Sequence, residues 1–90
     1  MKTLHIIVKG RVQGVGFRHF ARVQAKQRGL VGMVKNLSNG NVEIYANGKE
    51  EAVREYLNTI RQGPVSADVS DVDSDWQESS NTYDDFKVVF

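Results

Sequence analysis

The sequence predicts an α+β fold of order β-α-β-β-α-β, in which an antiparallel sheet carries two helices on one face as a split β-α-β sandwich. Three observations predict it. Segments with apolar residues at every second position alternate with segments that have apolar residues at helical spacing. Each helical segment is followed by a glycine. A Ser-Asn-Gly turn joins two strand-like segments into a hairpin.

The amino-terminal part of the chain predicts a strand, a helix and a second strand. Residues 2–10 alternate between apolar and polar side chains, which indicates a strand. A glycine-punctuated loop over residues 11–16 leads into a helix over residues 17–28, which Gly29 ends. Residues 30–37 are strand-like and precede the turn.

The remaining part predicts the return strand of the hairpin and the second helix. The strand covers residues 41–46, after the turn at residues 38–40. Asn47 followed by Glu50 is typical of a helix cap and its reciprocal partner, so we expect the helix to begin there and to run to about Arg61.

A weaker, acid-rich strand over residues 65–76, a polar turn over 77–85 and a short terminal strand over 86–90 complete the prediction. We assign the terminal strand to core packing alone. In a right-handed β-α-β unit the first two strands run parallel, so their carboxyl ends meet at one rim of the sheet. The loop over 11–16, the start of the first helix and Asn36 should therefore converge.

The bulk composition excludes several classes of protein. The 90 residues suffice for one domain, over residues 1–90. Without cysteine there is no disulfide, thiolate nucleophile or cysteine metal site. We expect no membrane segment and no signal peptide, and therefore a cytoplasmic protein.

Charge is divided unevenly along the chain. Residues 1–42 contain eight Lys or Arg and no acid, whereas residues 43–90 contain four Lys or Arg and all eleven acids. An acid-free basic half suits an anionic ligand. A fold that neutralises itself across its own surface explains the same division, and charge alone leaves both interpretations open.

The loop at the predicted rim has the chemistry of an anion site. Three glycines within seven residues let backbone N–H groups turn inward as a nest, and the following helix aims its positive end at the same point. Arg18 in the first turn opposes the helix dipole, which favours a role in holding an anion. The alternative is a glycine-rich turn without a ligand. The spacing matches neither a Walker loop nor a dinucleotide fingerprint.

Two strings carry a family resemblance. GRVQGVGFR at residues 10–18 resembles the first signature of the acylphosphatases, and GMVKN at residues 32–36 resembles the second. The order of elements is similar along essentially all 90 residues. The resemblance implies a ferredoxin-like fold and a stand-alone acylphosphatase-like domain. It also implies hydrolysis of the carboxyl–phosphate bond of acyl phosphates, with no metal, no cofactor and no covalent phosphoenzyme.

The resemblance also implies roles for particular residues. The substrate-binding residues would be Gln13, Gly14, Val15, Gly16, Phe17 and Arg18. Backbone N–H groups of the loop would cradle the phosphate, Arg18 would bind its oxygens, and the Asn36 side chain would orient the attacking water. A carboxylate leaving group is a weak base, with a pKa of about 4, so no general acid is needed. Without the motif, Asn36 could equally be a strand-end residue that bonds the following turn.

Some positions depart from the family pattern. Met33 stands where an aromatic residue is frequent, and Leu37 and Asn41 stand where the vertebrate enzymes carry Thr. No hydroxyl at those positions can support Asn36.

The two histidines are not assigned to the site. His19 adjoins Arg18 but points elsewhere on the helix, and His5 and His19, as isolated histidines, do not make a metal site.

We expect a monomer that takes a small-molecule acyl phosphate and binds neither nucleic acid nor membrane. Two other hypotheses stay open at this stage. RNA-binding sheets share this topology, but the central strands lack an aromatic-rich RNA-binding string. A non-catalytic anion-binding accessory domain is the other possibility, against which a chain that begins at Met1 favours a stand-alone protein.

Overall fold

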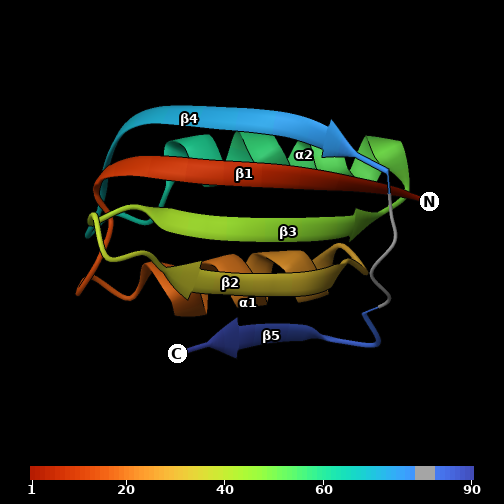
Figure 1. The fold of residues 1–90 in the computed structure, drawn as a ribbon, viewed down its shortest axis with the longest axis horizontal. Coiled ribbons are helices and arrows are strands. Elements are labelled where there is room, and N and C mark those ends of the chain that lie inside the picture. The colour runs from red at the N-terminus through yellow and green to blue at the C-terminus, as the bar shows by residue number, and fades with distance from the viewer. Residues whose placement is uncertain (79–82) are drawn as a thin grey trace.

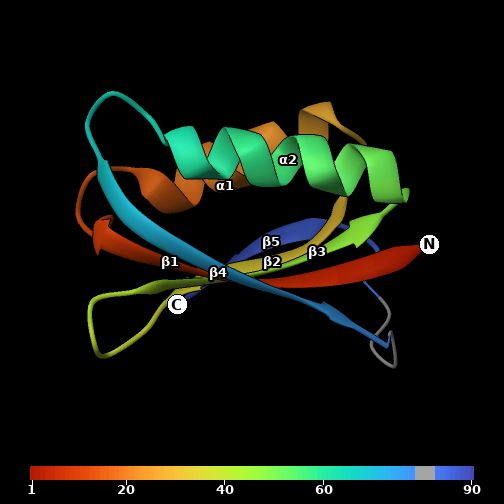
Figure 2. The same cartoon turned by 90° about the horizontal axis from the view of Figure 1, so that it is seen from above.

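The computed structural model describes residues 1–78 and 83–90. Its elements are β1 (Lys2–Arg11), α1 (Phe17–Gln27), β2 (Val31–Asn36), β3 (Val42–Gly48), α2 (Glu50–Gln62), β4 (Asp68–Gln77) and β5 (Phe86–Val89). The strands form one sheet in the order β4-β1-β3-β2-β5. Both helices lie on the same face of this sheet (Figures 1 and 2). The predicted ferredoxin-like fold is confirmed. Residues 79–82 of the predicted polar turn lie outside the described residues.

The sheet is mixed, so the prediction of an antiparallel sheet is wrong for one pair of strands. β5 pairs with β2 in parallel, whereas β1 is antiparallel to both β3 and β4, and β2 is antiparallel to β3. The cause is the position of the two edge strands. β4 ends at the rim where β1 begins, and β5 starts from that same rim on the opposite edge (Figure 1). It therefore runs in the direction of β1 and β2.

The core lies between the helices and the inner face of the sheet. Alternate residues of the strands and the apolar stripes of both helices are buried together. The largest fully buried side chains include Tyr56, Phe17, Phe86, Leu4, Ile6 and Ile44. The Tyr56 hydroxyl donates a hydrogen bond of 2.9 Å to the Ala21 carbonyl, which joins α2 to α1. This bond fixes the helix that begins at the predicted anion loop.

The predicted cap of the second helix is wrong. Asn47 belongs to β3, and its Nδ2 donates a hydrogen bond of 2.6 Å to Thr3 Oγ1 on β1. α2 begins at Glu50 after an N-cap residue, Lys49, that makes no side-chain cap bond. The strand continues past its predicted end because Asn47 pairs with both neighbouring strands.

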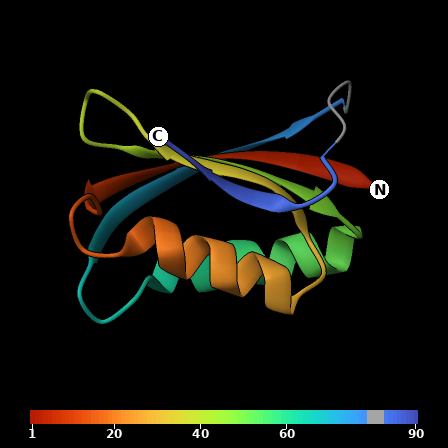
Figure 3. The same ribbon diagram turned by 90° about the horizontal axis from the view of Figure 1, so that it is seen from below.

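The predicted convergence at one rim is confirmed. Val8 of β1 and Asn36 of β2 both lie opposite Val42 of β3, so the carboxyl ends of β1 and β2 reach the same rim. The loop after β1 and the β2–β3 hairpin lie together at the left of Figure 1, and Figure 3 shows α1 starting there.

In the described residues no helix has the length and apolar character that crossing a membrane requires.

Candidate active site

A cavity of about 590 Å³ opens at this rim and takes its lining from the loop after β1, α1, the end of β2 and β5. Of the residues predicted for the site, it brings together Gly14, Gly16, Phe17, Arg18 and Asn36. Gln13 and Val15 are not among its lining residues. They form bonds that hold the loop in place.

The loop needs its glycines for the shape of the backbone. Gly14 has φ 73° and Gly16 has φ 77°, in the left-handed region that other residues rarely adopt. A Cβ atom built on either glycine would meet nothing within 4 Å. The space beside the loop is therefore open, as an inward-facing nest of N–H groups requires.

The start of α1 faces the cavity without a capping side chain. Gly16 is the N-cap residue, it makes no side-chain cap bond, and the first turn holds no acidic residue. A helix begins with N–H groups that lack intrahelical partners, and it carries partial positive charge at that end. Arg18 adds a full positive charge in the same turn. Together these groups have the charge and the donors that suit an anion with several oxygens.

Three residues anchor the loop to the rest of the fold. Val12 is buried in the core, at 1% exposure. Gln13 Nε2 donates hydrogen bonds of 2.8 Å to the carbonyls of Leu37 and Asn41, and Ser66 Oγ donates one of 2.8 Å to the Val15 carbonyl. The sequence analysis missed these contacts of Gln13 and Ser66, because they join segments that are far apart in the chain and carry no local signal.

The side-chain oxygen of Asn36 gives the clearest indication of what this residue could bind. Its Oδ1 is buried, lies in a residue that lines the cavity, and has no hydrogen-bond partner in the described residues. The alternative role, a bond to the following turn, is filled by another residue: Asn39 Oδ1 accepts a bond of 3.1 Å from the Asn41 N–H. A buried acceptor without a partner costs about 1–3 kcal/mol, so this oxygen is suited to a water or a ligand.

Arg18 is held from one side by the carboxyl terminus. Its guanidinium carbon lies 4.8 Å from the centre of the Phe90 ring. The prediction that the terminal segment only packs in the core holds for Phe86, which is buried, and is wrong for Phe90, which is 98% exposed. This is a cation–π contact, in which the positive charge of the guanidinium faces the ring.

Each of the two interpretations of the uneven charge holds for part of the basic half. Five basic residues of the first half form ion pairs with carboxylates of the second half, namely Lys2, Lys9, Lys26, Arg28 and Lys35. Arg18 and Arg22 line the cavity and form no ion pair within residues 1–78 and 83–90. The fold thus neutralises most of its basic half and leaves positive charge at the cavity. The sequence analysis missed Arg22, although its i,i+4 spacing from Arg18 places both on one helix face.

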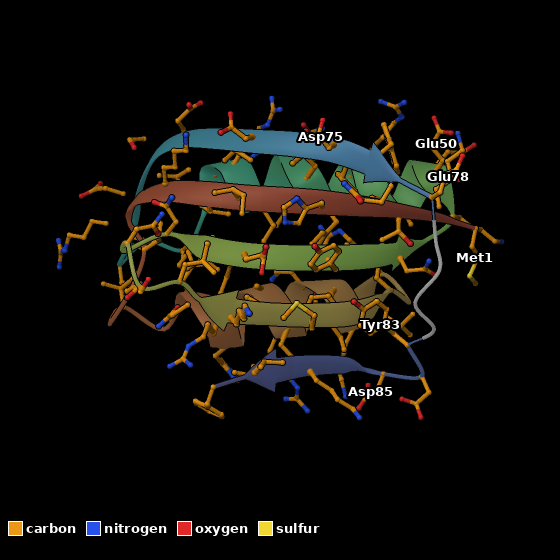
Figure 4. The ribbon with its side chains drawn as sticks, in the orientation of Figure 1. Met1, Glu50, Asp75, Glu78, Tyr83 and Asp85 are labelled. Atoms are coloured by element: carbon orange, nitrogen blue, oxygen red, sulfur yellow. The ribbon has the colours of Figure 1, made fainter. Side chains whose placement is uncertain are left out.

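Asp85 lines the cavity at the start of β5, the opposite end of that strand from Phe90 (Figure 4). The backbone N–H of Phe86 and then the Lys26 ammonium hold the pKa of its carboxyl below the usual range. Asp85 therefore stays ionised at neutral pH and is no proton donor.

His19 also lines the cavity. Within the described part of the chain, no group of three or more His, Asp or Glu could hold a metal ion.

The fold and this site define a class: a ferredoxin-like α+β sandwich with a glycine-rich loop between its first strand and first helix, beside a cavity that Arg18 lines. The family model described as Acylphosphatase matches residues 4–88. An acylphosphatase of Dehalococcoides mccartyi is 48% identical over 89 residues, which cover 98% of each chain. The crystal structure of acylphosphatase from Bacillus subtilis matches with a TM-score of 0.96 and 39% identity over 100% of both chains. An acylphosphatase from Coxiella burnetii matches with a TM-score of 0.93 and 38% identity, over 98% of this chain and 92% of that one.

The chain belongs to the acylphosphatase family. Members of this family are hydrolases that act on acyl phosphates, and the resemblance drawn from the two sequence strings is confirmed.

Proposed function

We propose that this chain hydrolyses the carboxyl–phosphate bond of small acyl phosphates in the cavity at the rim of the sheet. Gln13–Phe17 would supply backbone N–H groups, Arg18 a guanidinium, and Asn36 the side chain that orients water. One observation carries the proposal: Asn36, whose buried Oδ1 has no hydrogen-bond partner in the described residues, lines the same cavity as Arg18 and the loop glycines. The family supports the reaction, and this geometry supports the assignment of residues.

The phosphoryl group would be held by charge and geometry. Phosphoryl transfer passes through a loose transition state in which charge spreads over three equatorial oxygens. The loop N–H groups and the start of α1 would bind some of these oxygens, while Arg18 binds others through its edge. Such donors act most strongly when they are fixed in advance, and the hydrogen bond from Ser66 to the Val15 carbonyl helps to fix the loop.

Water would attack from the side of Asn36. Its Oδ1 accepts a hydrogen bond from the water, which points an oxygen lone pair at phosphorus. A new P–O bond forms as the bond between phosphorus and the acyl oxygen breaks, and the carboxylate leaves with that electron pair. One proton of the water stays on the inorganic phosphate and the other passes to solvent. The carboxylate needs no proton, because its pKa is about 4.

The test compares benzoyl phosphate hydrolysis, with a metal chelator present, between the parent, Arg18→Ala and Arg61→Ala. Arg61 is an exposed arginine of α2 that does not line the cavity, so its loss changes net charge equally. We expect the parent to turn over under chelation, because its own residues supply the positive charge. Arg18→Ala should lower turnover by roughly a hundredfold or more, and Arg61→Ala should leave it unchanged. An inactive parent, or a folded Arg18→Ala variant at the parental rate, would refute the proposal.

The same proposal includes a monomer in the cytoplasm. Arg18, Asn36 and the loop glycines lie in one cavity of a single chain, which supports a monomer. The mass of the monomer is 10.1 kDa, and light scattering of the purified protein checks it.

A further inference from the structure

The side chain of Gln13 reaches from the anion loop to the β2–β3 hairpin. Its Nε2 donates hydrogen bonds of 2.8 Å to two carbonyls, those of Leu37 and Asn41. An amide nitrogen carries two N–H donors, so both bonds can form at once. The Asn41 carbonyl also accepts a bond of 2.8 Å from the Leu37 N–H, and the Leu37 carbonyl accepts one of 3.2 Å from the Gly40 N–H. Gln13 therefore binds the hairpin where its two strands meet the turn.

The two carbonyls lie directly beside the residue proposed to orient water. Leu37 follows Asn36 in the chain, and Asn41 precedes Val42, the residue opposite Asn36 in the sheet. On the other side, Gln13 precedes Gly14, the first left-handed glycine of the loop. One side chain thus joins the backbone next to the loop donors with the backbone next to Asn36.

Other groups near the hairpin do not provide this connection. Ser38, Asn39 and Gly40 at the tip are exposed, and the Asn39 side chain is bonded within the turn itself. Ser66 contacts the loop from the opposite segment, between α2 and β4, and does not reach the hairpin.

From this contact we infer that Gln13 is a positioning residue, which sets the place of the Asn36 side chain relative to the bound phosphoryl group. The inference rests on the proposed function of Asn36. Loss of the amide would let the hairpin shift against the loop, and a misplacement of about 1 Å can cost roughly a hundredfold in rate. Phosphate affinity should change little, because its ligands are loop N–H groups and Arg18.

The experiment measures kcat for benzoyl phosphate and the inhibition constant of inorganic phosphate. The variants are Gln13→Ala, Gln13→Met, Asn36→Ala and the double variant Gln13→Ala with Asn36→Ala. Gln13→Met keeps the length of the side chain without its donors, in case the alanine variant does not fold. Gln27→Ala, at an exposed glutamine that ends α1, is the matched control.

We expect kcat to fall roughly tenfold to a hundredfold in both Gln13 variants, while the phosphate inhibition constant changes less than about threefold. In the Asn36→Ala background the Gln13 substitution should cost little more, because residues that act as a unit are not additive. Gln27→Ala should match the parent.

Three outcomes would overturn the inference. These are a parental kcat in both Gln13 variants, a loss of phosphate affinity equal to the loss of kcat, and full additivity with Asn36→Ala. The second outcome would mean that Gln13 only supports the phosphate-binding loop. If Asn36→Ala itself keeps the parental kcat, the proposed function fails first, whatever the Gln13 variants do.

Discussion

Truncation of Asn36 to alanine should lower activity, while stability stays unchanged or rises. In the reaction, Oδ1 contributes one oriented hydrogen bond, and removal of such a group from a prearranged site costs about 2.7–4 kcal/mol, or roughly 10²- to 10³-fold in kcat. In the folded protein this oxygen is a buried acceptor without a partner in the described residues. Its removal sacrifices no hydrogen bond within residues 1–78 and 83–90, so the free energy of unfolding should stay unchanged or rise by up to about 1 kcal/mol.

The assay pairs steady-state hydrolysis of benzoyl phosphate with thermal unfolding followed by circular dichroism. For a domain of this size, 1 kcal/mol corresponds to a shift in Tm of about 4–8 °C, so a rise or a fall is measurable. Asn58→Ala, at an exposed position of α2, is the matched control and should keep full activity. A folded Asn36→Ala variant with parental kcat would remove Asn36 from the mechanism. A variant that loses about 2 kcal/mol or more of stability would show that the amide is a structural group.

Two further predictions concern the loop and the bond between the helices. Gly16→Ala should fold, because a Cβ there meets nothing within 4 Å, but should lose about 1–2 kcal/mol in urea unfolding because φ is 77°. Tyr56→Phe should lose about 1 kcal/mol at neutral pH with the hydrogen bond to Ala21. Burial raises the pKa of Tyr56 above the ordinary value, so the parent should lose stability as pH rises through the unfolded pKa of about 10. The phenylalanine variant should show a shallower alkaline decline in urea titrations, and parallel declines would contradict this cause.

Much of the fold and the main site residues could be predicted because their signals are local. Alternation in β1 and helical spacing in α1 reflect which side chains meet the core, and each pattern is complete within one element. The rim follows from the handedness of one β-α-β unit, which places Asn36 beside the loop although it lies 18 positions after Arg18 in the chain. The sequence strings then identify which of the rim residues belong to the family pattern.

The contacts that the sequence could not predict join residues that are far apart in the chain. They depend on where the fold places the partner as well as on the residue itself. Asn47 has the composition of a helix cap, yet a hydrogen bond to Thr3 on the neighbouring strand keeps it in β3. Phe90 continues an apolar alternation but lies one residue beyond β5, where its ring contacts the Arg18 guanidinium. Nothing in the local sequence indicates the role of Gln13, because the hairpin carbonyls that it binds lie beside it only in the folded chain.

Several locally unfavourable features gather in one cavity. A guanidinium sits in the first turn of a helix, where it opposes the dipole, and that helix begins without a capping side chain. Two glycines hold left-handed conformations, and a buried amide oxygen lacks a partner in the described residues. The guanidinium, the uncapped helix start and the unpartnered oxygen each cost stability alone, and a bound phosphoryl group with an attacking water would relieve them together. The loop is anchored to the rest of the fold by Val12, Gln13 and the Ser66 contact, which confines this cost to the rim.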